Sequence, residues 1–256
     1  MKKNNRLDQY IQDKLPDVSR TQIASMIMQG KVKVDGKINT KPGTLVNTDS
    51  EVEFNFEEPK YVSRAGFKLE KALDYFNIDV NGLVALDAGI STGGFTHCML
   101  QRGIKKVYGV DVGFGQVHER VTRDPRVILL EKTNLRNLES LPEPIDLVTL
   151  DLSFISLLKV MPAVVNILSE PKGRVECMMK YNGQLVVLIK PQFEAKKHQI
   201  GKGGIVKDES VHKEVIETIT SGIKGFGFEC VGVIESPIAG TTGNKEFLAY
   251  FKRNKI

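Results

Sequence analysis

The sequence predicts two parts, a small α+β module followed by a larger α/β domain with a doubly wound, mostly parallel sheet. From Ser63 onward, short apolar runs alternate with amphipathic helical patterns, as in a parallel sheet covered by helices. Before that point, short helical and strand patterns fill residues 6–57 and stop at a charged, proline-containing segment. We therefore expect one domain at residues 1–57, a linker at 58–62 and a second domain at 63–256.

Two helices are expected at the start of the first part. Apolar side chains recur at helical spacing from Arg6 onward, which predicts the first helix. Ser19 is suited to cap a second helix, and Gly30 is suited to end it.

Strands follow these helices in the first part. The Asp35-Gly36 pair between the apolar-polar alternations at 31–34 and 36–38 predicts a β-hairpin. A last strand is expected at 52–56, where apolar and polar residues alternate again.

The second part is expected to hold seven strands. They are predicted at residues 84–88, 106–110, 126–130, 146–151, 184–190, 228–235 and 246–252. Helices are predicted at residues 64–76, 93–102, 114–122, 157–168 and 208–223. Since a loop rather than a helix joins the last two strands, we expect them to pair antiparallel.

Composition indicates a soluble protein with a mild preference for polyanions. The 256 residues are 41% hydrophobic and 26% charged, with a formal net charge of +5. Residues 1–50 carry nine Lys or Arg against five Asp, so the first part is the more basic one. The three cysteines are odd in number and far apart, which favours a reducing cytosol, and no apolar stretch is long enough for a membrane span.

The glycine-rich turn after the first strand of the second part predicts a nucleoside pocket. The run follows the pattern Asp87-x-Gly89-x-Ser91-x-Gly93-Gly94-Phe95, with an acid at the strand end and a helix after the turn. It differs from the Gly-x-Gly-x-x-Gly pattern of dinucleotide folds, and it holds no basic residue for a pyrophosphate. A nucleoside ligand without phosphate, such as S-adenosylmethionine, suits this turn better.

Four charged residues occupy positions where such a sheet exposes its working edge. They are Lys68, Asp151, Lys190 and Glu246. Burial and a neighbouring cation both disfavour the charged form of a lysine, which can make it a general base near neutral pH. The carboxylates would orient the amines and balance their charge, and this chemistry needs neither histidine nor metal.

The four charged residues, in this order around the glycine-rich turn, resemble the Lys-Asp-Lys-Glu tetrad of ribose 2′-O-methyltransferases of the FtsJ/RrmJ type. The whole chain resembles the TlyA family, in which an S4 RNA-binding domain precedes such a methyltransferase. The matching segments are residues 6–8, 19–20, 30–32, 42–44, 61–64, 68–73, 91–96, 111–113, 124–127, 133–134, 151–156, 190–194, 201–204 and 243–246. The chain departs from the family around 172–184, where the loop before the Lys190 strand is longer.

The resemblance implies a Rossmann-like class I methyltransferase that methylates a cytidine 2′-hydroxyl in ribosomal RNA, on the large subunit for a short N-terminal arm. Lys190 would take the hydroxyl proton, Lys68 and Asp151 would position the Lys190 amine and the hydroxyl, and Glu246 would balance the charge. The expected contacts to S-adenosylmethionine are Asp87, Gly89, Ser91, Thr92, Gly93, Gly94, Phe95, Asp111, Thr133 and Asn134. The expected contacts to ribosomal RNA or a ribosomal subunit are Arg6, Arg20, Lys31, Lys33, Lys41 and Arg64. The exact nucleotide and the oligomeric state stay open.

Four other functions were weighed against this one. Gly89-Ile90-Ser91-Thr92-Gly93 also fits the nucleophile elbow of hydrolases, with Asp151 or Asp208 and His212 as partners, although we expect His212 at the surface. A non-catalytic RNA-binding protein and a haemolysin-like cytolysin are the alternatives from other classes. A base methyltransferase is disfavoured because no Pro-Pro-aromatic stretch follows Asp151.

Overall fold

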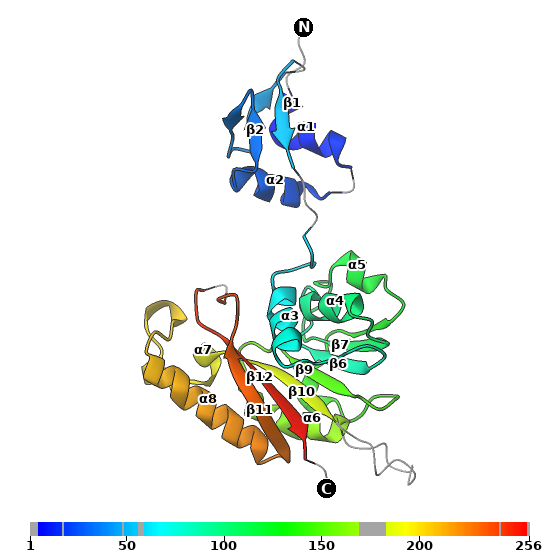
Figure 1. The fold of residues 1–256 in the computed structure, drawn as a ribbon, viewed down its shortest axis with the longest axis vertical. Coiled ribbons are helices and arrows are strands. Elements are labelled where there is room, and N and C mark those ends of the chain that lie inside the picture. The colour runs from blue at the N-terminus through cyan, green and yellow to red at the C-terminus, as the bar shows by residue number, and fades with distance from the viewer. Residues whose placement is uncertain are drawn as a thin grey trace. The chain divides into compact units, whose positions relative to one another are not determined.

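The computed structural model describes residues 5–16, 18–47, 49–55, 59–168, 183–240 and 242–254 (Figure 1). The chain separates into two compact units between Pro59 and Lys60, and each is described by itself. Three sequence expectations fall outside the described residues: the boundary at 56–58, the extended loop at 172–182, and the pairing state of Cys177. Cys98 and Cys230 are free thiols.

The first unit contains the two expected helices, α1 (Leu7–Lys14) and α2 (Arg20–Met28). Ser19 caps α2 as expected, through a reciprocal capping box with Gln22. The apolar faces of both helices meet in a core that includes Ile11, Ile23 and Ile27.

Short strands complete the first unit. The strands are β1 (Asn5–Arg6), β2 (Val32–Val34), β3 (Lys37–Ile38), β4 (Leu45–Val46) and β5 (Val52–Phe54). β2 pairs with β3 as the predicted hairpin, and Asp35 and Gly36 both have positive φ angles, 49° and 74°. This is the backbone that a two-residue hairpin turn requires, because its twist matches that of the strands.

The second unit contains one seven-stranded sheet in the order β11-β12-β10-β9-β6-β7-β8. Its strands are β6 (Val84–Ala88), β7 (Lys106–Val110), β8 (Val127–Leu130), β9 (Leu147–Leu150), β10 (Gln184–Ile189), β11 (Phe228–Glu235) and β12 (Phe247–Arg253). β12 lies antiparallel to both of its neighbours, while the pairs among β6 to β10 are parallel. The expected mostly parallel sheet with an antiparallel final pair is confirmed.

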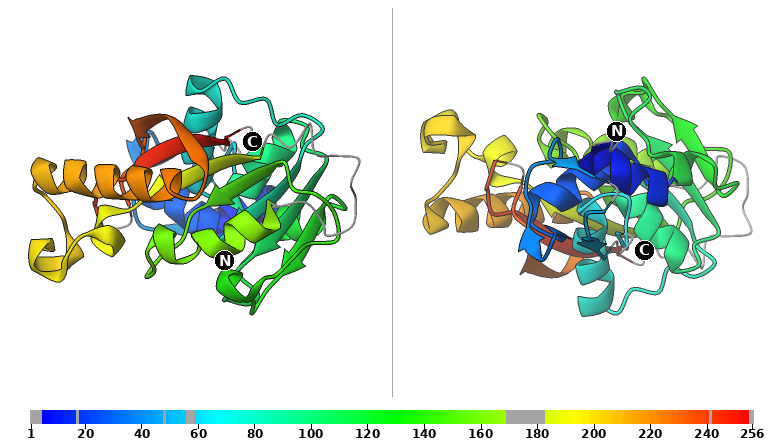
Figure 2. Two further views of the ribbon diagram at one scale, coloured as in Figure 1. Left: turned by 90° about the horizontal axis from the view of Figure 1, so that it is seen from below. Right: turned by 90° about the horizontal axis from the view of Figure 1, so that it is seen from above.

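Helices cover both faces of this sheet (Figure 2). α3 (Ala65–Tyr75) and α4 (Gly94–Gln101) bury their apolar residues on one face, and α6 (Met161–Ile167) and α8 (Glu209–Lys224) bury theirs on the other. A short helix, α7 (Pro191–Glu194), follows β10 directly. Among the described residues, no helix combines the length and the apolar run that a bilayer span requires.

Two expected helices are shorter than the sequence pattern indicated. The helix expected at 114–122 is only α5 (Glu119–Thr122), since Gly115 adopts a left-handed φ of 68° that no helix continues through. The helix expected at 157–168 divides into a 3₁₀ turn (Leu157–Lys159) and α6, because Pro162 suits only the first turn of a new helix.

The strand order places the working edge of the sheet. The chain moves outward from β6 through β7 to β8, then returns to the other side of β6 with β9 and β10. Loops at the carboxyl ends of β6 and β9 therefore leave in opposite directions and open a crevice between them. Ligands of open α/β sheets bind at such a switch point.

Candidate active site

The turn after β6 approaches the end of β9 very closely. Gly89 has a φ of 83°, and a Cβ built on it would lie 2.4 Å from the backbone carbonyl oxygen of Asp151. Only glycine combines this backbone conformation with this approach. The glycine that the sequence singled out thus brings the end of β6 against the residue proposed for catalysis.

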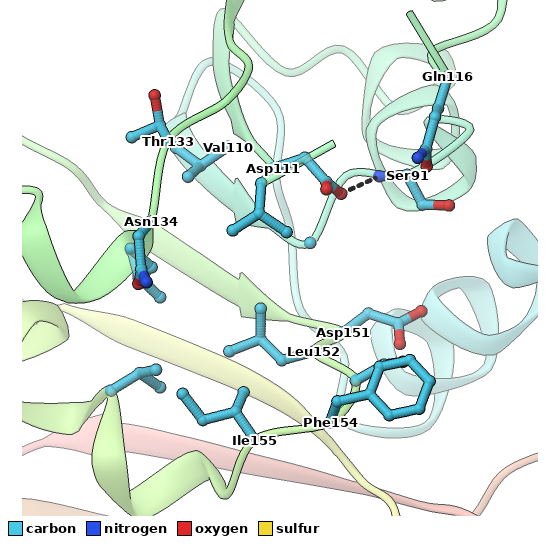
Figure 3. A pocket seen from close by; sticks show the side chains of 15 residues that line it. Ser91, Val110, Asp111, Gln116, Thr133, Asn134, Asp151, Leu152, Phe154 and Ile155 are labelled. Carbon is cyan, nitrogen blue, oxygen red and sulfur yellow. Dashed lines mark hydrogen bonds between the residues drawn. The ribbon is translucent and has the colours of Figure 1, made fainter. Parts of the chain in front are cut away.

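A cavity of about 440 Å³ opens at the carboxyl ends of β6, β7 and β9 (Figure 3). Five of the residues expected to hold the donor line it: Gly89, Ser91, Asp111, Thr133 and Asn134. Apolar side chains form other walls, among them Val110, Leu152 and Ile155. Asp151 is also part of the lining, so the cavity reaches the candidate catalytic residues.

Asp111 is fixed at the end of β7 by backbone donors. Its Oδ2 accepts a hydrogen bond from the Ser91 amide at 2.9 Å, and its Oδ1 accepts one from the Gly113 amide at 2.8 Å. Each carboxylate oxygen can accept more than one hydrogen bond. The carboxylate is therefore oriented without being saturated, as a group that holds a pair of ribose hydroxyls must be.

The remaining turn residues have packing roles in the structure. Thr92, Gly93, Gly94 and Phe95 were expected at the ligand, but the described residues that line the cavity do not include them. A Cβ on Gly94 would lie 2.3 Å from Ser63 Oγ, so this glycine allows α4 to pack against the start of α3. Phe95 is buried in the core on that same face. Direct contact with the donor was the wrong interpretation for these four residues.

Asp87 also differs from the expectation. Its side chain is fully buried, and its two oxygens accept hydrogen bonds from Thr96 Oγ1 at 2.6 Å and Thr149 Oγ1 at 2.8 Å. It belongs to the support beneath the turn, and the cavity lining does not contain it among the described residues. Burial raises its pKa to about 6, against the lowering effect of the two threonine hydroxyls.

We expect Asp87 to make the catalytic unit less stable as the pH rises. Its pKa is about 6 in the folded chain against a model value of 3.8, so the fold favours its protonated form. This contribution is complete below pH 3.8 and is lost as the pH rises through 6, a change of about 3 kcal/mol in unfolding free energy. Asp87→Asn should remove this loss, which denaturant unfolding between pH 4.5 and 8 would measure. A wild-type-to-variant difference that stays constant over this range would contradict the assignment.

The four candidate catalytic residues form two ion pairs. Lys190 Nζ lies 2.6 Å from Asp151 Oδ1, and Lys68 Nζ lies 2.6 Å from Glu246 Oε2. Glu246 is only 3% exposed, and the two lysines are almost as buried. Lys68 was expected to hold Lys190, but its partner in the structure is Glu246.

Three further residues of this site escaped the sequence reasoning. Ser153 Oγ accepts a hydrogen bond from Lys190 Nζ at 3.0 Å, next to the contact with Asp151. Phe154 is 89% exposed and has a positive φ of 64°, a strained conformation for an aromatic residue. Its ring lies against Phe193 with the ring centroids 4.9 Å apart. Their position directly after Asp151 was the only signal in the sequence.

Glu194 connects the segments that follow β9 and β10. Its Oε1 accepts a hydrogen bond from the Leu157 amide at 2.7 Å. Burial raises the pKa of this carboxyl. The loop that carries Ser153 and Phe154 is thus held at its far end by the helix that follows Lys190.

The family comparison agrees with this geometry. The pattern of FtsJ-like methyltransferases matches residues 61–253, and that of S4 domains matches residues 5–52. The chain belongs to the FtsJ-like methyltransferase family.

Relatives of this methyltransferase match over most of its length. The 16S/23S rRNA (cytidine-2'-O)-methyltransferase TlyA of Mycobacterium tuberculosis is 40% identical over 91% of this chain and 84% of its own. Hemolysin A of Brachyspira hyodysenteriae is 39% identical over 96% of this chain and 99% of its own. A solved structure from Streptococcus thermophilus, named as a hemolysin, has a TM-score of 0.73 and 39% identity, covering 99% of this chain and 90% of its own.

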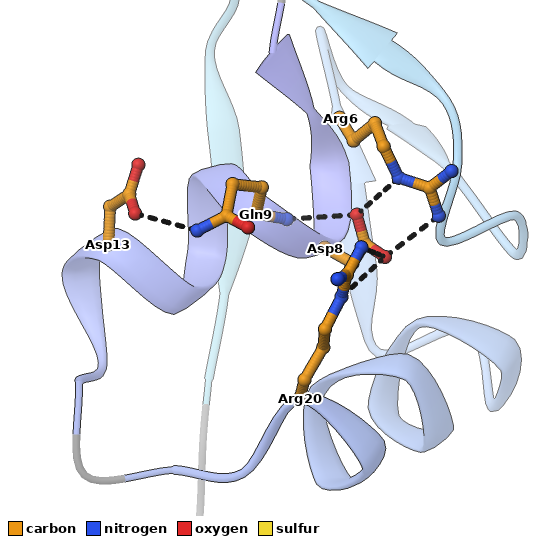
Figure 4. Close-up of polar contacts among 5 residues, drawn as sticks. All are labelled: Arg6, Asp8, Gln9, Asp13 and Arg20. Carbon is orange, nitrogen blue, oxygen red and sulfur yellow. Dashed lines mark hydrogen bonds and ion pairs between the residues drawn. The ribbon is translucent and has the colours of Figure 1, made fainter.

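The S4 domain of this methyltransferase holds two of the expected RNA contacts on one carboxylate (Figure 4). Arg6 and Arg20 both donate to Asp8, at 2.9 Å and 3.1 Å to its Oδ2. The hydrogen bond from Arg6 is the main reason that the pKa of Asp8 is lowered to about 2. Both arginine side chains are still more than half exposed.

The other expected RNA contacts are also at the surface. Lys31 and Lys41 are exposed on the S4 domain, and Lys33 is exposed beside Glu53 at 3.6 Å. Arg64 is exposed at the start of α3 in the methyltransferase domain. Each is placed where it could meet a phosphate.

The hydrolase alternative finds no support in the geometry of its histidine. His212 is buried, with its Nε2 2.9 Å from the Val206 carbonyl oxygen. The expectation of a surface position for His212 was wrong. The ring faces a backbone carbonyl of its own neighbourhood, which is a structural contact and not that of a general base beside Ser91.

Proposed function

We propose that this methyltransferase transfers a methyl group from S-adenosylmethionine to the ribose 2′-hydroxyl of a cytidine in ribosomal RNA, with large-subunit RNA as the first candidate substrate. The observation that carries the proposal is the 2.6 Å contact of Lys190 with Asp151 at the rim of the cavity. An amine held by a carboxylate beside a nucleoside-sized cavity suits the activation of an alcohol. The name of the Mycobacterium tuberculosis relative supports the choice of substrate.

The cavity fits the proposed donor in size and in chemistry. Its volume of about 440 Å³ lies in the range of small-molecule sites. The Asp111 carboxylate suits the ribose hydroxyls, while Thr133 and Asn134 offer polar groups for the adenine edge. When bound, S-adenosylmethionine would supply a methyl group activated by a sulfonium centre.

The residues at the rim would prepare the attacking hydroxyl. The oxygen forms a bond to the methyl carbon, the carbon–sulfur bond breaks, and the hydroxyl proton passes to the neutral amine of Lys190. Asp151 and Ser153 fix the position of that amine through contacts of 2.6 Å and 3.0 Å. Holding the hydroxyl in line with the methyl group would supply a large part of the rate acceleration.

The second ion pair would keep the surroundings of Lys190 electrostatically balanced. Lys68 is neutralised by Glu246, whose other oxygen lies 3.5 Å from the Gln192 side-chain amide. A buried pair of this kind is costly to break, because removing one partner leaves an unpaired charge. In our proposal Lys68 and Glu246 position the segments around the acceptor ribose.

The exposed ring of Phe154 would hold the target base. Proteins that act on a single nucleotide take it out of its stack and place its base against aromatic side chains. Phe154 projects at the cavity wall directly after Asp151, and its contact with Phe193 keeps it there. Arg6 and Arg20 would then bind phosphates of the surrounding RNA.

Methylation in vitro tests the proposal directly. The purified chain is incubated with radiolabelled S-adenosylmethionine and unmodified large or small ribosomal subunits, and the product is mapped by primer extension at low nucleotide concentration. We expect one new stop at a cytidine in large-subunit RNA. No label on either subunit, or label on a base, would overturn the proposal and leave a non-catalytic RNA-binding protein as the alternative.

A further inference from the structure

A loop next to the catalytic residues has so far been given no role. Residues 201–207, which we call the lysine loop, lie between α7 and α8, in the yellow part of the ribbon (Figure 1). The loop includes the Gly201-Lys202-Gly203-Gly204 segment and ends with Lys207. α7 begins directly after Lys190, so the loop follows the catalytic strand closely.

Asn244 anchors the lysine loop to the segment that carries Glu246. The Asn244 side chain is 1% exposed; its Nδ2 donates to the Gly204 carbonyl at 3.0 Å, and its Oδ1 accepts from the Val206 amide at 2.9 Å. Asn244 comes two residues before Glu246. The loop is thus an ordered part of the rim around the two ion pairs, since both ends of one buried amide hold its backbone.

The two lysines of the loop are exposed and carry unbalanced charge. Across the described residues, Lys202 and Lys207 have no acidic side chain within ion-pair distance. The neighbouring acids are engaged elsewhere: Glu214 with Lys196, Glu209 with Lys245, and Asp208 as the cap of α8. Solvated lysines with no internal partner at the rim of a site favour an anionic ligand.

The backbone between these lysines is also open. Gly203 and Gly204 have φ angles of 77° and 75°, and a Cβ built on either would meet nothing within 4 Å. These glycines are therefore not required by packing against the protein. They keep the main chain bare on its outer side, which allows an extended polyanion to approach closely.

We propose that the lysine loop binds backbone phosphates of the RNA strand that adjoins the target nucleotide. This inference rests on the proposed function, because it assigns the loop to the same RNA substrate. Lys202 and Lys207 would each neutralise one phosphate and hold the strand beside Lys190. The catalytic domain would then contribute to RNA affinity independently of the S4 domain.

The test compares two double variants of the full chain. K202Q/K207Q removes both loop charges. The control K224Q/K252Q removes two exposed charges at the opposite edge of the sheet, where α8 ends roughly 24 Å from its start and β12 pairs with the first residue of β10. Equilibrium binding to rRNA is measured at several salt concentrations, together with KM and kcat for methylation.

We expect K202Q/K207Q to weaken RNA binding roughly tenfold and to reduce the salt slope by about 1 to 2, near 0.9 per lost phosphate contact. KM for RNA should rise, while kcat at saturating RNA and the affinity for S-adenosylmethionine stay unchanged. The control should match the wild type. A salt slope and KM equal to those of the control would overturn the inference, whereas a wild-type chain that binds rRNA without methylating it would overturn the proposed function alone.

Discussion

Replacing Lys190 by alanine is expected to lower the methylation rate by about 10³-fold or more, while S-adenosylmethionine still binds. The amine at this position would receive the proton of the attacking hydroxyl, and no other described amine is held by Asp151 and Ser153. Its loss leaves the hydroxyl protonated and free to rotate. Single-turnover methylation of ribosomal subunits measures the rate, and calorimetric titration measures donor binding.

A second variant and a control distinguish chemistry from folding. Lys190→Arg keeps the positive charge but cannot accept a proton, since the guanidinium stays charged in proteins, so we expect it to be as inactive as alanine. Lys224→Ala removes an exposed lysine at the far end of α8 and should be fully active. Substantial activity in Lys190→Arg would refute the role of this amine as a base.

Replacing Asp111 by alanine is expected to weaken S-adenosylmethionine binding by about 10²-fold. Two hydrogen bonds from ribose hydroxyls to a carboxylate contribute about 1.5 to 3 kcal/mol each before any compensation by water. The same substitution also releases the Ser91 and Gly113 amides that the carboxylate now accepts. Titration with S-adenosylmethionine gives the dissociation constant, and kcat at saturating donor should change far less.

Glu131 provides a matched control for Asp111. Its carboxylate accepts a hydrogen bond from the Gly115 amide at 2.8 Å, so it fixes the same connection after β7, but the cavity lining in the described residues does not include it. Glu131→Gln should change donor affinity by less than about twofold, as an exposed hydrogen bond contributes little. Equal losses in both variants would mean that the loop conformation, and not the Asp111 carboxylate, determines binding.

Most of the fold could be predicted because apolar periodicity is strong in a parallel sheet. Each of the seven expected strands is present within two residues of its expected bounds, since buried strands read as continuous apolar runs. The shorter helices depend on single residues, Gly115 and Pro162, whose effect on a helix is decided by local backbone geometry. The pattern of apolar residues does not contain this information.

The site was predictable where strand ends determine position. Asp111 and Asp151 come at the ends of adjacent elements of the sheet, so their convergence on one cavity follows from topology. Which side of the turn a residue faces does not follow from topology. Asp87 points into the support of the turn and Phe95 into the core because Thr96, Thr149 and α3 surround them, and these partners are far away in the sequence or on another face.

The shared carboxylate of Asp8 has a consequence for the thermodynamics of RNA binding. A free arginine side chain carries about 2 kcal/mol of rotamer entropy, which is lost when it is immobilised on a ligand. Arg6 and Arg20 have already lost much of this freedom on folding, because Asp8 fixes both guanidinium groups. The S4 domain therefore presents a preorganised cationic pair, whose association with RNA should carry a smaller entropic penalty than that of two flexible side chains.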